Sequence, residues 1–287
     1  MNTWLLFILT CYCWIAAFAN PILQNTTETT DEHFLTKSDF TCRSDRNPVV
    51  LVHGLLAANY ELDGIAAFLR EKGFCSYALT YGAYPGVPFI GGLKSVAESS
   101  KEIARFIKYV QMKTGADKID LIGHSEGAMQ VLYVPKFRGV SPIIEHIVAI
   151  APPTHGVPLY GLQYLVPDFI WRSGMGVLQS LGCGACADML RGGPAAKQLD
   201  DGTPIAQPGN KVTIIVSKFD QGVIPHAAAS FVNEEGVNNI YVQDYCSLDI
   251  VGHFNEPGDK NIMNLILNAL EDQTGRKFPC SLALPLR

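Results

Sequence analysis

The chain has 287 residues, of which 48% are hydrophobic and 17% are charged, and its formal net charge is −5. That length and apolar content predict one large domain that can bury a core of its own. The mild acidity and the lack of basic runs in the sequence argue against nucleic acid and against an anionic membrane surface as electrostatic partners.

The first 19 residues have the pattern of a secretory signal peptide. An apolar stretch opens at Trp4–Leu9, and Ala17-Phe18-Ala19 offers a cleavage site of small residues. The stretch is short for a membrane span, although the missing basic residues at its start leave an uncleaved anchor as the alternative. We therefore expect residues 1–19 to be removed and the protein to be secreted, with no transmembrane segment after signal removal.

Residues 20–38 are rich in Thr, Asp, Glu and Asn, which predicts a flexible leader. The leader contains the sequon Asn25-Thr26-Thr27, so we expect glycosylation at Asn25 if a eukaryotic secretory pathway makes the protein. Residues 39–287 are expected to form a single α/β domain.

Buried strands and amphipathic helices alternate along that domain. Apolar runs without polar alternation predict strands buried on both faces. The expected strands are Pro48–Gly54, Cys75–Tyr81, a run from Ile119 into Gly123, Ile147–Ala151, Lys211–Ser217 and Ile240–Val242. Helical spacing of apolar residues predicts helices at Glu61–Lys72, Val96–Thr114, from Ser125 to near Pro135, and Asn261–Leu270. This order predicts a mostly parallel, doubly wound sheet.

One connection is much longer than the others. Residues 152–210 separate two expected strands, far more than a helical crossover needs. Within it, residues 156–195 are rich in apolar side chains and broken by Gly and Pro. Such insertions are usually functional, which predicts an apolar cap or lid; the alternative is a helical excursion that completes the core. We expect His155, Leu159 and Phe169 to line a substrate pocket there.

Cysteine usage agrees with export. Six cysteines remain after the signal peptide: Cys42, Cys75, Cys183, Cys186, Cys246 and Cys280. An even number in a secreted chain indicates disulfides, but six cysteines allow 15 pairings. The Cys183-Gly-Ala-Cys186 spacing is also compatible with a redox or zinc pair. No second close Cys or His pair accompanies it in the sequence, which favours a structural role, and we expect no metal.

The stretch that carries chemistry is Ile119–Met129, which contains Gly123-His124-Ser125-Glu126-Gly127. An apolar strand runs into Gly-x-Ser-x-Gly, and helix-forming residues follow. This is the layout of a nucleophile elbow, in which a tight turn exposes a serine hydroxyl and small residues let strand and helix approach. We therefore interpret Ser125 as a catalytic nucleophile; the alternative is an ordinary turn serine.

An acid and a base are expected downstream of such a serine, in that order. Asp220 follows the end of an expected parallel strand, where catalytic groups gather, although a solvated turn aspartate also fits. His253 lies in a Gly-flanked loop before the last helix and is the expected base. Asp249 is a competing acid. The remaining downstream histidines, His146 and His226, are expected to be structural or at the rim.

These residues predict hydrolysis through an acyl-enzyme. His253 takes the proton of Ser125, and Asp220 holds the imidazole tautomer. The oxyanion needs N–H donors, which we expect from Glu126 and from Leu55, after the first buried strand. A carboxylate facing the oxyanion would oppose its charge, so we expect the Glu126 side chain to point away.

With these residues in place, the chain resembles the secreted class 2 lipases of the α/β-hydrolase fold over about residues 40–270. The resemblance is carried by an ordered set of motifs: Cys42 before Pro48–Gly54, Gly73-Phe74-Cys75, Gly91-Gly92, Asp120–Ser125, Ala151–Gly156, Cys183 and Cys186, Gln243–Asp249 and His253. It implies extracellular hydrolysis of triacylglycerol or other carboxylic esters without a cofactor. It also implies a lipid ester substrate, contact with lipid emulsions and a disulfide between Cys42 and Cys75.

Two other functions stay open at this stage. One is a non-catalytic lipid-binding protein on the same fold, for which the unusual Glu126 would be the sign. The other is an acyltransferase, or an esterase of sterol esters or polyesters, in a site from which water is excluded.

Overall fold

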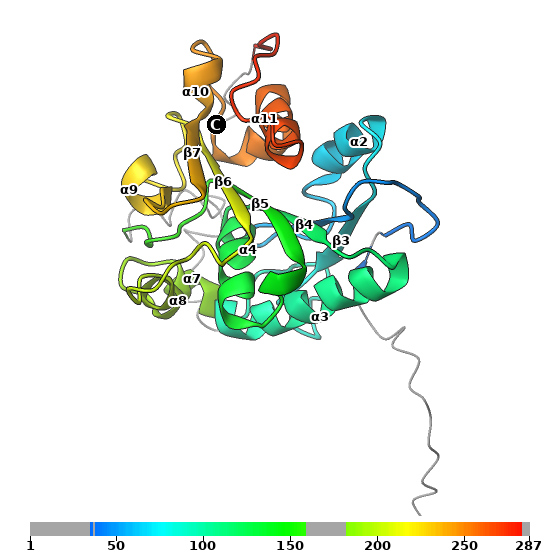
Figure 1. Ribbon diagram of the computed structural model, residues 1–287. Helices are drawn as coiled ribbons and strands as arrows, with labels where there is room; N and C mark the ends of the chain where they lie inside the picture. The colour runs from blue at the N-terminus through cyan, green and yellow to red at the C-terminus, as the bar shows by residue number, and fades with distance from the viewer. Residues whose placement is uncertain (1–34, 37, 159–181, 283–287) are drawn as a thin grey trace, which may run out of the picture. The chain divides into compact units, whose positions relative to one another are not determined.

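Seven strands form one sheet in the order β1-β3-β2-β4-β5-β6-β7 (Figure 1). The structure is a computed structural model that describes residues 35–36, 38–158 and 182–282. The strands are β1 (Leu35–Thr36), β2 (Val49–Val52), β3 (Ser76–Thr80), β4 (Ile119–His124), β5 (Ile144–Ile150), β6 (Lys211–Val216) and β7 (Val237–Tyr241). β2 to β7 pair in parallel, which confirms the expected sheet.

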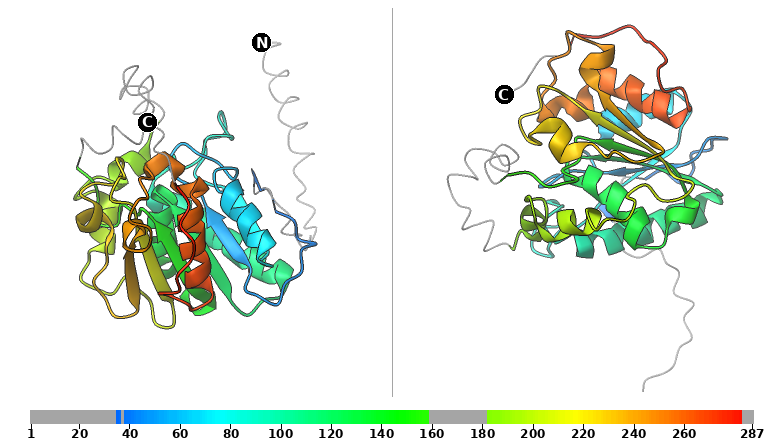
Figure 2. Two further views of the ribbon diagram at one scale, coloured as in Figure 1. Left: turned by 90° about the horizontal axis from the view of Figure 1, so that it is seen from above. Right: turned by 60° about the vertical axis from the view of Figure 1, so that its left-hand side comes forward.

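Helices cover both faces of the sheet (Figure 2). They are α2 (Asp63–Glu71), α3 (Val96–Thr114), α4 (Glu126–Phe137), η1 (Ser141–Ile143), α7 (Gly184–Asp188), α8 (Pro194–Leu199), α9 (His226–Ser230), α10 (Val242–Tyr245), η2 (His253–Gly258) and α11 (Lys260–Leu270). Alternate residues of a strand point to opposite faces. Val50 and Val52 pack in the cluster that contains α3 and α4, whereas Val49 and Leu51 pack in the cluster that contains α2 and α11.

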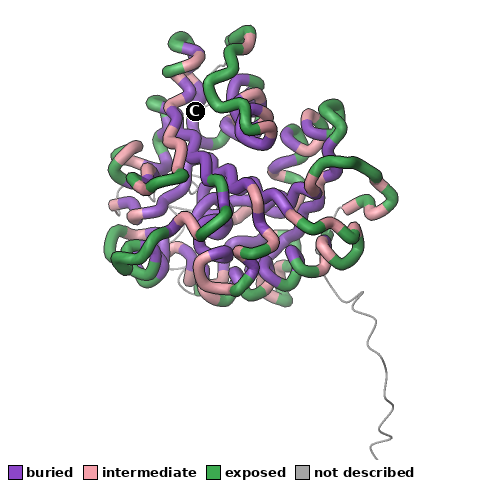
Figure 3. Tube along the Cα trace, in the orientation of Figure 1, coloured by how far each residue is buried: buried purple, intermediate pink, exposed green. Residues whose placement is uncertain are grey.

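The central strands are buried on both sides, as their continuous apolar runs predict (Figure 3). Within the described ranges, no helix is both long and apolar enough to cross a membrane. The parallel order places the carboxyl ends of β2, β4 and β6 along one edge of the sheet, where loops can gather side chains from distant parts of the sequence.

Some boundaries differ from expectation. Leu35 and Thr36, expected in the leader, form an antiparallel edge strand against β3, because Leu35 pairs with Thr80. β7 begins three residues before Ile240, and Val242 starts α10 instead of ending the strand. The side chains at both ends of β7 are half-buried, so its apolar signal is weak.

The expected lid lies partly outside the described residues. The undescribed part, 159–181, includes Leu159 and Phe169. Residues 1–19, expected to be a signal peptide, and Asn25 also lie outside the described residues. The chain on either side of 159–181 is paired: the Val157 N–H donates to Met189 O at 2.8 Å, and the Arg191 N–H donates to Val157 O at 2.8 Å.

Three disulfides are formed within the described residues. Cys42 pairs with Cys75, Cys183 with Cys186, and Cys246 with Cys280. The first joins the chain before β2 to the start of β3, across a separation of 33 residues. The second closes only 3 residues, at the start of α7. The structure therefore shows which cysteines pair with one another, which the sequence alone did not determine.

Loop length predicts unequal contributions from two of these disulfides. Replacing Cys42 and Cys75 together with alanine should lower the free energy of unfolding by about 4 kcal/mol, because a long closed loop restricts the unfolded chain. Replacing Cys183 and Cys186 together is the matched control and should cost only about 2 kcal/mol. Denaturant unfolding of the two variants checks this expectation, and equal losses would contradict it.

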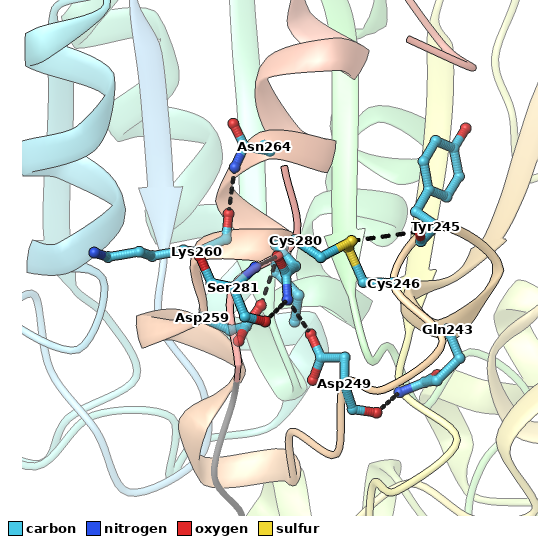
Figure 4. The surroundings of a disulfide bond; sticks show 11 residues. Gln243, Tyr245, Cys246, Asp249, Asp259, Lys260, Asn264, Cys280 and Ser281 are labelled. Atoms are coloured by element: carbon cyan, nitrogen blue, oxygen red, sulfur yellow. Dashed lines mark hydrogen bonds between the residues drawn. A yellow bond between two sulfur atoms is a disulfide. The ribbon is translucent and has the colours of Figure 1, made fainter. Parts of the chain in front are cut away.

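The third disulfide lies beside a polar cluster next to α11 in which Asp249, Asp259 and Asn261 are buried (Figure 4). Asn261 donates to Asp249 Oδ2 at 2.7 Å and to the Ser281 carbonyl at 2.8 Å, which ties the C-terminal segment to the loop before η2. Asp259 caps α11 by accepting the Ile262 N–H at 2.9 Å. Burial, together with the neighbouring Asp249 carboxylate, raises the pKa of Asp259 to about 6.

Asp259 should therefore make stability fall as the pH rises. Its stabilising contribution is complete below its unfolded pKa of about 4 and is lost as the pH passes its folded pKa of about 6. Asp259→Asn keeps a capping oxygen without a charge. Urea unfolding at pH 4 and pH 6.5 should show this variant gaining stability relative to the parent at the higher pH. A difference that does not change with pH would contradict the assignment.

Candidate active site

Ser125 occupies a sharp turn between β4 and α4. Its φ of +56° is rare for a residue other than glycine, and its N–H donates to Ile150 O on β5 at 2.9 Å. The turn is possible because its flanking glycines lack side chains. A Cβ on Gly123 would lie 2.2 Å from Gly127 O, and a Cβ on Gly127 would lie 2.1 Å from Val52 O. This is the strained strand-turn-helix geometry of a nucleophile elbow.

His253 and Asp220 lie in line with the Ser125 hydroxyl. His253 Nε2 is 2.9 Å from Ser125 Oγ, and His253 Nδ1 is 2.9 Å from Asp220 Oδ2. All three residues are at most 3% exposed. They come from the loop after β6, the start of η2 and the elbow, and the parallel sheet brings these segments to one edge.

Asp220 is held rigidly as a carboxylate. Its Oδ1 accepts the N–H groups of Gly222 at 2.6 Å and Val223 at 2.9 Å, which leaves Oδ2 to face His253. Burial opposes the charge, but His253 and these N–H donors outweigh it and lower the pKa of Asp220. The competing acid, Asp249, instead accepts the Val251 N–H and the Asn261 amide.

The loop after β2 is oriented by His53. Its Nδ1 lies 2.7 Å from Gly54 O, and its Nε2 accepts the Tyr81 N–H at 3.3 Å, so Nδ1 carries the proton. This bond holds the Gly54 carbonyl on one side of the peptide, and the N–H of Leu55 therefore projects from the other side. Among the described residues, nothing accepts that N–H. His53 shapes the loop.

Glu126 is the first residue of α4, where backbone N–H groups have no acceptor within the helix. Its side chain is fully buried and contacts Gln130 at 3.4 Å and Tyr81. Its Oε2 would lie 2.3 Å from a Cβ at Gly92, so the carboxyl group fits only because residue 92 is glycine. Burial raises the pKa of Glu126 well above its usual range, which favours the neutral carboxyl group.

Three side chains near the triad carry no signature in the sequence. Glu256, three residues after His253, is fully buried, and its Oε2 is 3.8 Å from His253 Nδ1. His124 precedes Ser125 and lies between Glu256 and Glu61. Glu256 could have been noticed because it lies one helical turn after His253, and His124 because it lies in the elbow. Both patterns are too common in sequences to identify a site residue by themselves.

His155 is not brought to the triad. It borders a pocket of about 370 Å³ that is lined by Leu199, Asp200, Gly202, Thr203, Pro204, Ile205, Val232, Asn233 and Glu234. Its Nδ1 is 2.5 Å from Asp200 Oδ1, and its Nε2 is 2.8 Å from the Phe231 carbonyl. No triad residue lines this pocket, and the other two residues of the expected substrate pocket, Leu159 and Phe169, lie outside the described residues.

The other downstream histidines also have fixed partners. His226 Nε2 is 2.8 Å from the Asp220 carbonyl, and His146 lies within β5 against Asp120. Two groups of described residues have side chains close enough to share a metal ion: His124, His253 and Glu256, and Asp120, Glu145 and His146. In both groups histidine nitrogens already face carboxylates, so a cation would compete with the protein's own hydrogen bonds.

Comparisons with known proteins agree with this geometry. Residues 46–137 match the family model of lipase (class 2). The chain is 25% identical to a triacylglycerol lipase of Vibrio cholerae serotype O1, over 88% of this chain and 78% of that protein. It is 28% identical to a triacylglycerol lipase of Pseudomonas fragi, over 40% of this chain but only 37% of that protein.

Solved structures show the same fold. Lipase B of Aspergillus fumigatus superposes with a TM-score of 0.65 at 17% identity, over 83% of this chain and 55% of that chain. A monoacylglycerol lipase of Paleococcus ferrophilus gives a TM-score of 0.54 at 17% identity, over 85% of this chain and 100% of that chain. The parallel sheet and its elbow define the α/β-hydrolase fold. Residues 46–137 are thus similar to the class 2 lipases, and the curated relatives are triacylglycerol lipases, which supports a carboxylic ester hydrolase.

Proposed function

We propose that this protein hydrolyses lipid esters, including triacylglycerols, through an acyl-enzyme on Ser125. The observation that carries the proposal is the continuous hydrogen-bonded line from Ser125 Oγ through His253 to Asp220, buried at the carboxyl edge of a parallel sheet. The names of the Vibrio cholerae and Pseudomonas fragi relatives support triacylglycerol as a substrate.

The first chemical step is attack of Ser125 Oγ on the ester carbonyl carbon. His253 Nε2 takes the hydroxyl proton, and the carbonyl electron pair moves to oxygen. The N–H groups of Leu55 and Glu126 then donate to this oxyanion. The Glu126 side chain contacts Gln130, and burial raises its pKa and so disfavours a negative charge beside the developing oxyanion.

The second half of the reaction returns the enzyme to its starting state. His253 gives its proton to the leaving alcohol, which departs and leaves the acyl group on Ser125. Water then attacks the acyl carbon while His253 again accepts a proton. Collapse of the second oxyanion breaks the bond between the acyl carbon and Ser125 Oγ, releases the fatty acid, and His253 gives its proton to Ser125 Oγ. Asp220 stabilises the imidazolium in both halves without taking its proton.

We also propose that the protein acts outside the cell, after removal of residues 1–19, with residues 39–287 as one catalytic domain. The three disulfides support this location because such bonds persist in oxidising compartments. Residues 156–195 are proposed as a lid that contacts lipid emulsions, and Asn25 as a glycosylation site.

An acyl chain-length series tests the proposal. Purified protein is assayed on p-nitrophenyl esters from acetate to palmitate and on emulsified triacylglycerol, and Ser125 is probed with a fluorophosphonate. We expect hydrolysis and covalent labelling of Ser125. Fatty-acid binding without labelling or hydrolysis would instead identify a lipid carrier. Preferential formation of new esters in the presence of added alcohol would identify an acyltransferase.

A further inference from the structure

His124 lies inside the elbow, directly before Ser125, and contacts both Glu61 and the backbone of His253. Its side chain is only 2% exposed. Its Nδ1 is 2.9 Å from Glu61 Oε1, and its Nε2 is 3.1 Å from the backbone carbonyl of His253. A carbonyl oxygen can only accept, and an ionised carboxylate can only accept, so both ring nitrogens must donate. The geometry therefore requires a charged imidazolium.

The electrostatics of the surroundings agree with this protonation state. Burial opposes the charge, but the carboxylates of Glu61 and Glu256 outweigh it and raise the pKa of His124 to about 10. The His124 charge in turn outweighs the effect of burial on Glu61, whose pKa is lowered. Glu61 and His124 are thus an ion pair throughout the neutral pH range.

Glu61 extends this pair to the loop after β2. Its second oxygen, Oε2, accepts the Gly54 N–H at 2.5 Å. Gly54 immediately precedes Leu55, the proposed oxyanion donor, and packs directly against the nucleophile. A Cβ at Gly54 would lie 3.2 Å from the Ser125 Cβ and 3.3 Å from Glu61 Oε1. A change at Glu61 therefore shifts the loop relative to the Ser125 side chain.

We propose that Glu61 and His124 form a positioning bridge that ties the loop carrying Leu55 to the backbone of His253. The bridge runs from the Gly54 N–H through the Glu61 carboxylate and the His124 ring to the His253 carbonyl. It rests on the proposed function, because it acts through the oxyanion donor and the base assigned there. Neither bridge residue takes part in bond making, so both are positioning residues.

The bridge is expected to affect turnover more than substrate binding. Displacing a catalytic group by about 1 Å can cost about 100-fold in rate. In Glu61→Gln the single remaining carbonyl oxygen can accept from His124 or from Gly54, but the new amide nitrogen cannot accept at all. We expect this variant to lower kcat roughly 30- to 100-fold while KM changes less than about threefold.

A second histidine–carboxylate pair in the same sheet supplies a matched control. His146 Nδ1 is 2.9 Å from Asp120 Oδ1, the same distance as in the bridge, and both side chains are largely buried. Asp120 follows the first residue of β4, at the end of the strand opposite to Ser125. His146→Gln should lower stability but leave kcat and KM within about threefold of the parent.

Parent, Glu61→Gln, His124→Gln, the double variant and His146→Gln are compared on a soluble p-nitrophenyl ester. The rate of fluorophosphonate labelling is a second readout, and thermal unfolding checks that each variant is folded. If the bridge is one unit, the double variant should lose no more kcat than the worse single variant. If His124→Gln does not fold, Glu61→Gln carries the test, because its side chain is 21% exposed and tolerates the change better.

The two proposals fail in different ways. A parent protein without hydrolysis or labelling would overturn the proposed function. An active parent whose folded Glu61→Gln variant keeps kcat within threefold, or loses it only as much as His146→Gln does, would overturn the bridge alone. Additive losses in the double variant would also overturn it.

Discussion

Replacing Ser125 with alanine should lower ester turnover by about a millionfold, to the level left by the rest of the site. The substitution removes only the side-chain hydroxyl group, and His253 Nε2 then has no hydroxyl to activate. The fold should survive because the strained φ of residue 125 suits alanine no worse than serine, and the N–H to Ile150 is retained. Steady-state kinetics on a soluble ester and thermal unfolding check both parts.

Ser230 offers a matched control for this change. It is fully buried, and its hydroxyl makes no hydrogen bond among the described residues. Ser230→Ala therefore deletes a buried serine oxygen at no cost in hydrogen bonding, and activity should stay within about twofold of the parent. Comparable activity in the Ser125 and Ser230 variants would refute the assigned nucleophile.

Replacing Asp220 with asparagine should lower kcat by about 10⁴-fold at neutral pH, as the corresponding change does in a serine protease triad. The Gly222 and Val223 N–H groups will hold the side-chain carbonyl where Oδ1 now lies. The new NH₂ group then faces His253 Nδ1 and donates to it. That fixes the proton on Nε2, and the imidazole can no longer accept the proton of Ser125.

Asp249→Asn separates this effect from the loss of any buried carboxylate. Asp249 is 1% exposed and also accepts a backbone N–H, from Val251 at 2.8 Å, but it faces Asn261 and not His253. We expect this variant to lose stability and to keep kcat within about threefold. If both aspartate variants lost kcat equally, Asp220 would have no special role.

Local patterns in the sequence are enough to indicate the sheet and the residues at its carboxyl edge. Strands that are buried on both faces of a parallel sheet are apolar runs in the sequence. The elbow is a local motif because the glycines that it needs lie within two residues of Ser125. Asp220 and His253 could be proposed because Asp220 follows the end of a strand and His253 lies in a loop before the last helix, in the order expected after Ser125. The class of protein was therefore predictable from the sequence.

Only the tertiary structure decided which polar groups meet in the interior. Glu61 and His124 are 63 residues apart, and His124 meets the His253 carbonyl across 129 residues, so no spacing rule connects them. The pairing of the six cysteines and the contacts of His155 with Asp200 and Phe231 likewise join residues that are distant in the sequence or have no pattern to link them. Hydrophobic periodicity specifies which face of an element is buried, whereas a contact between two side chains depends on how the packed elements meet.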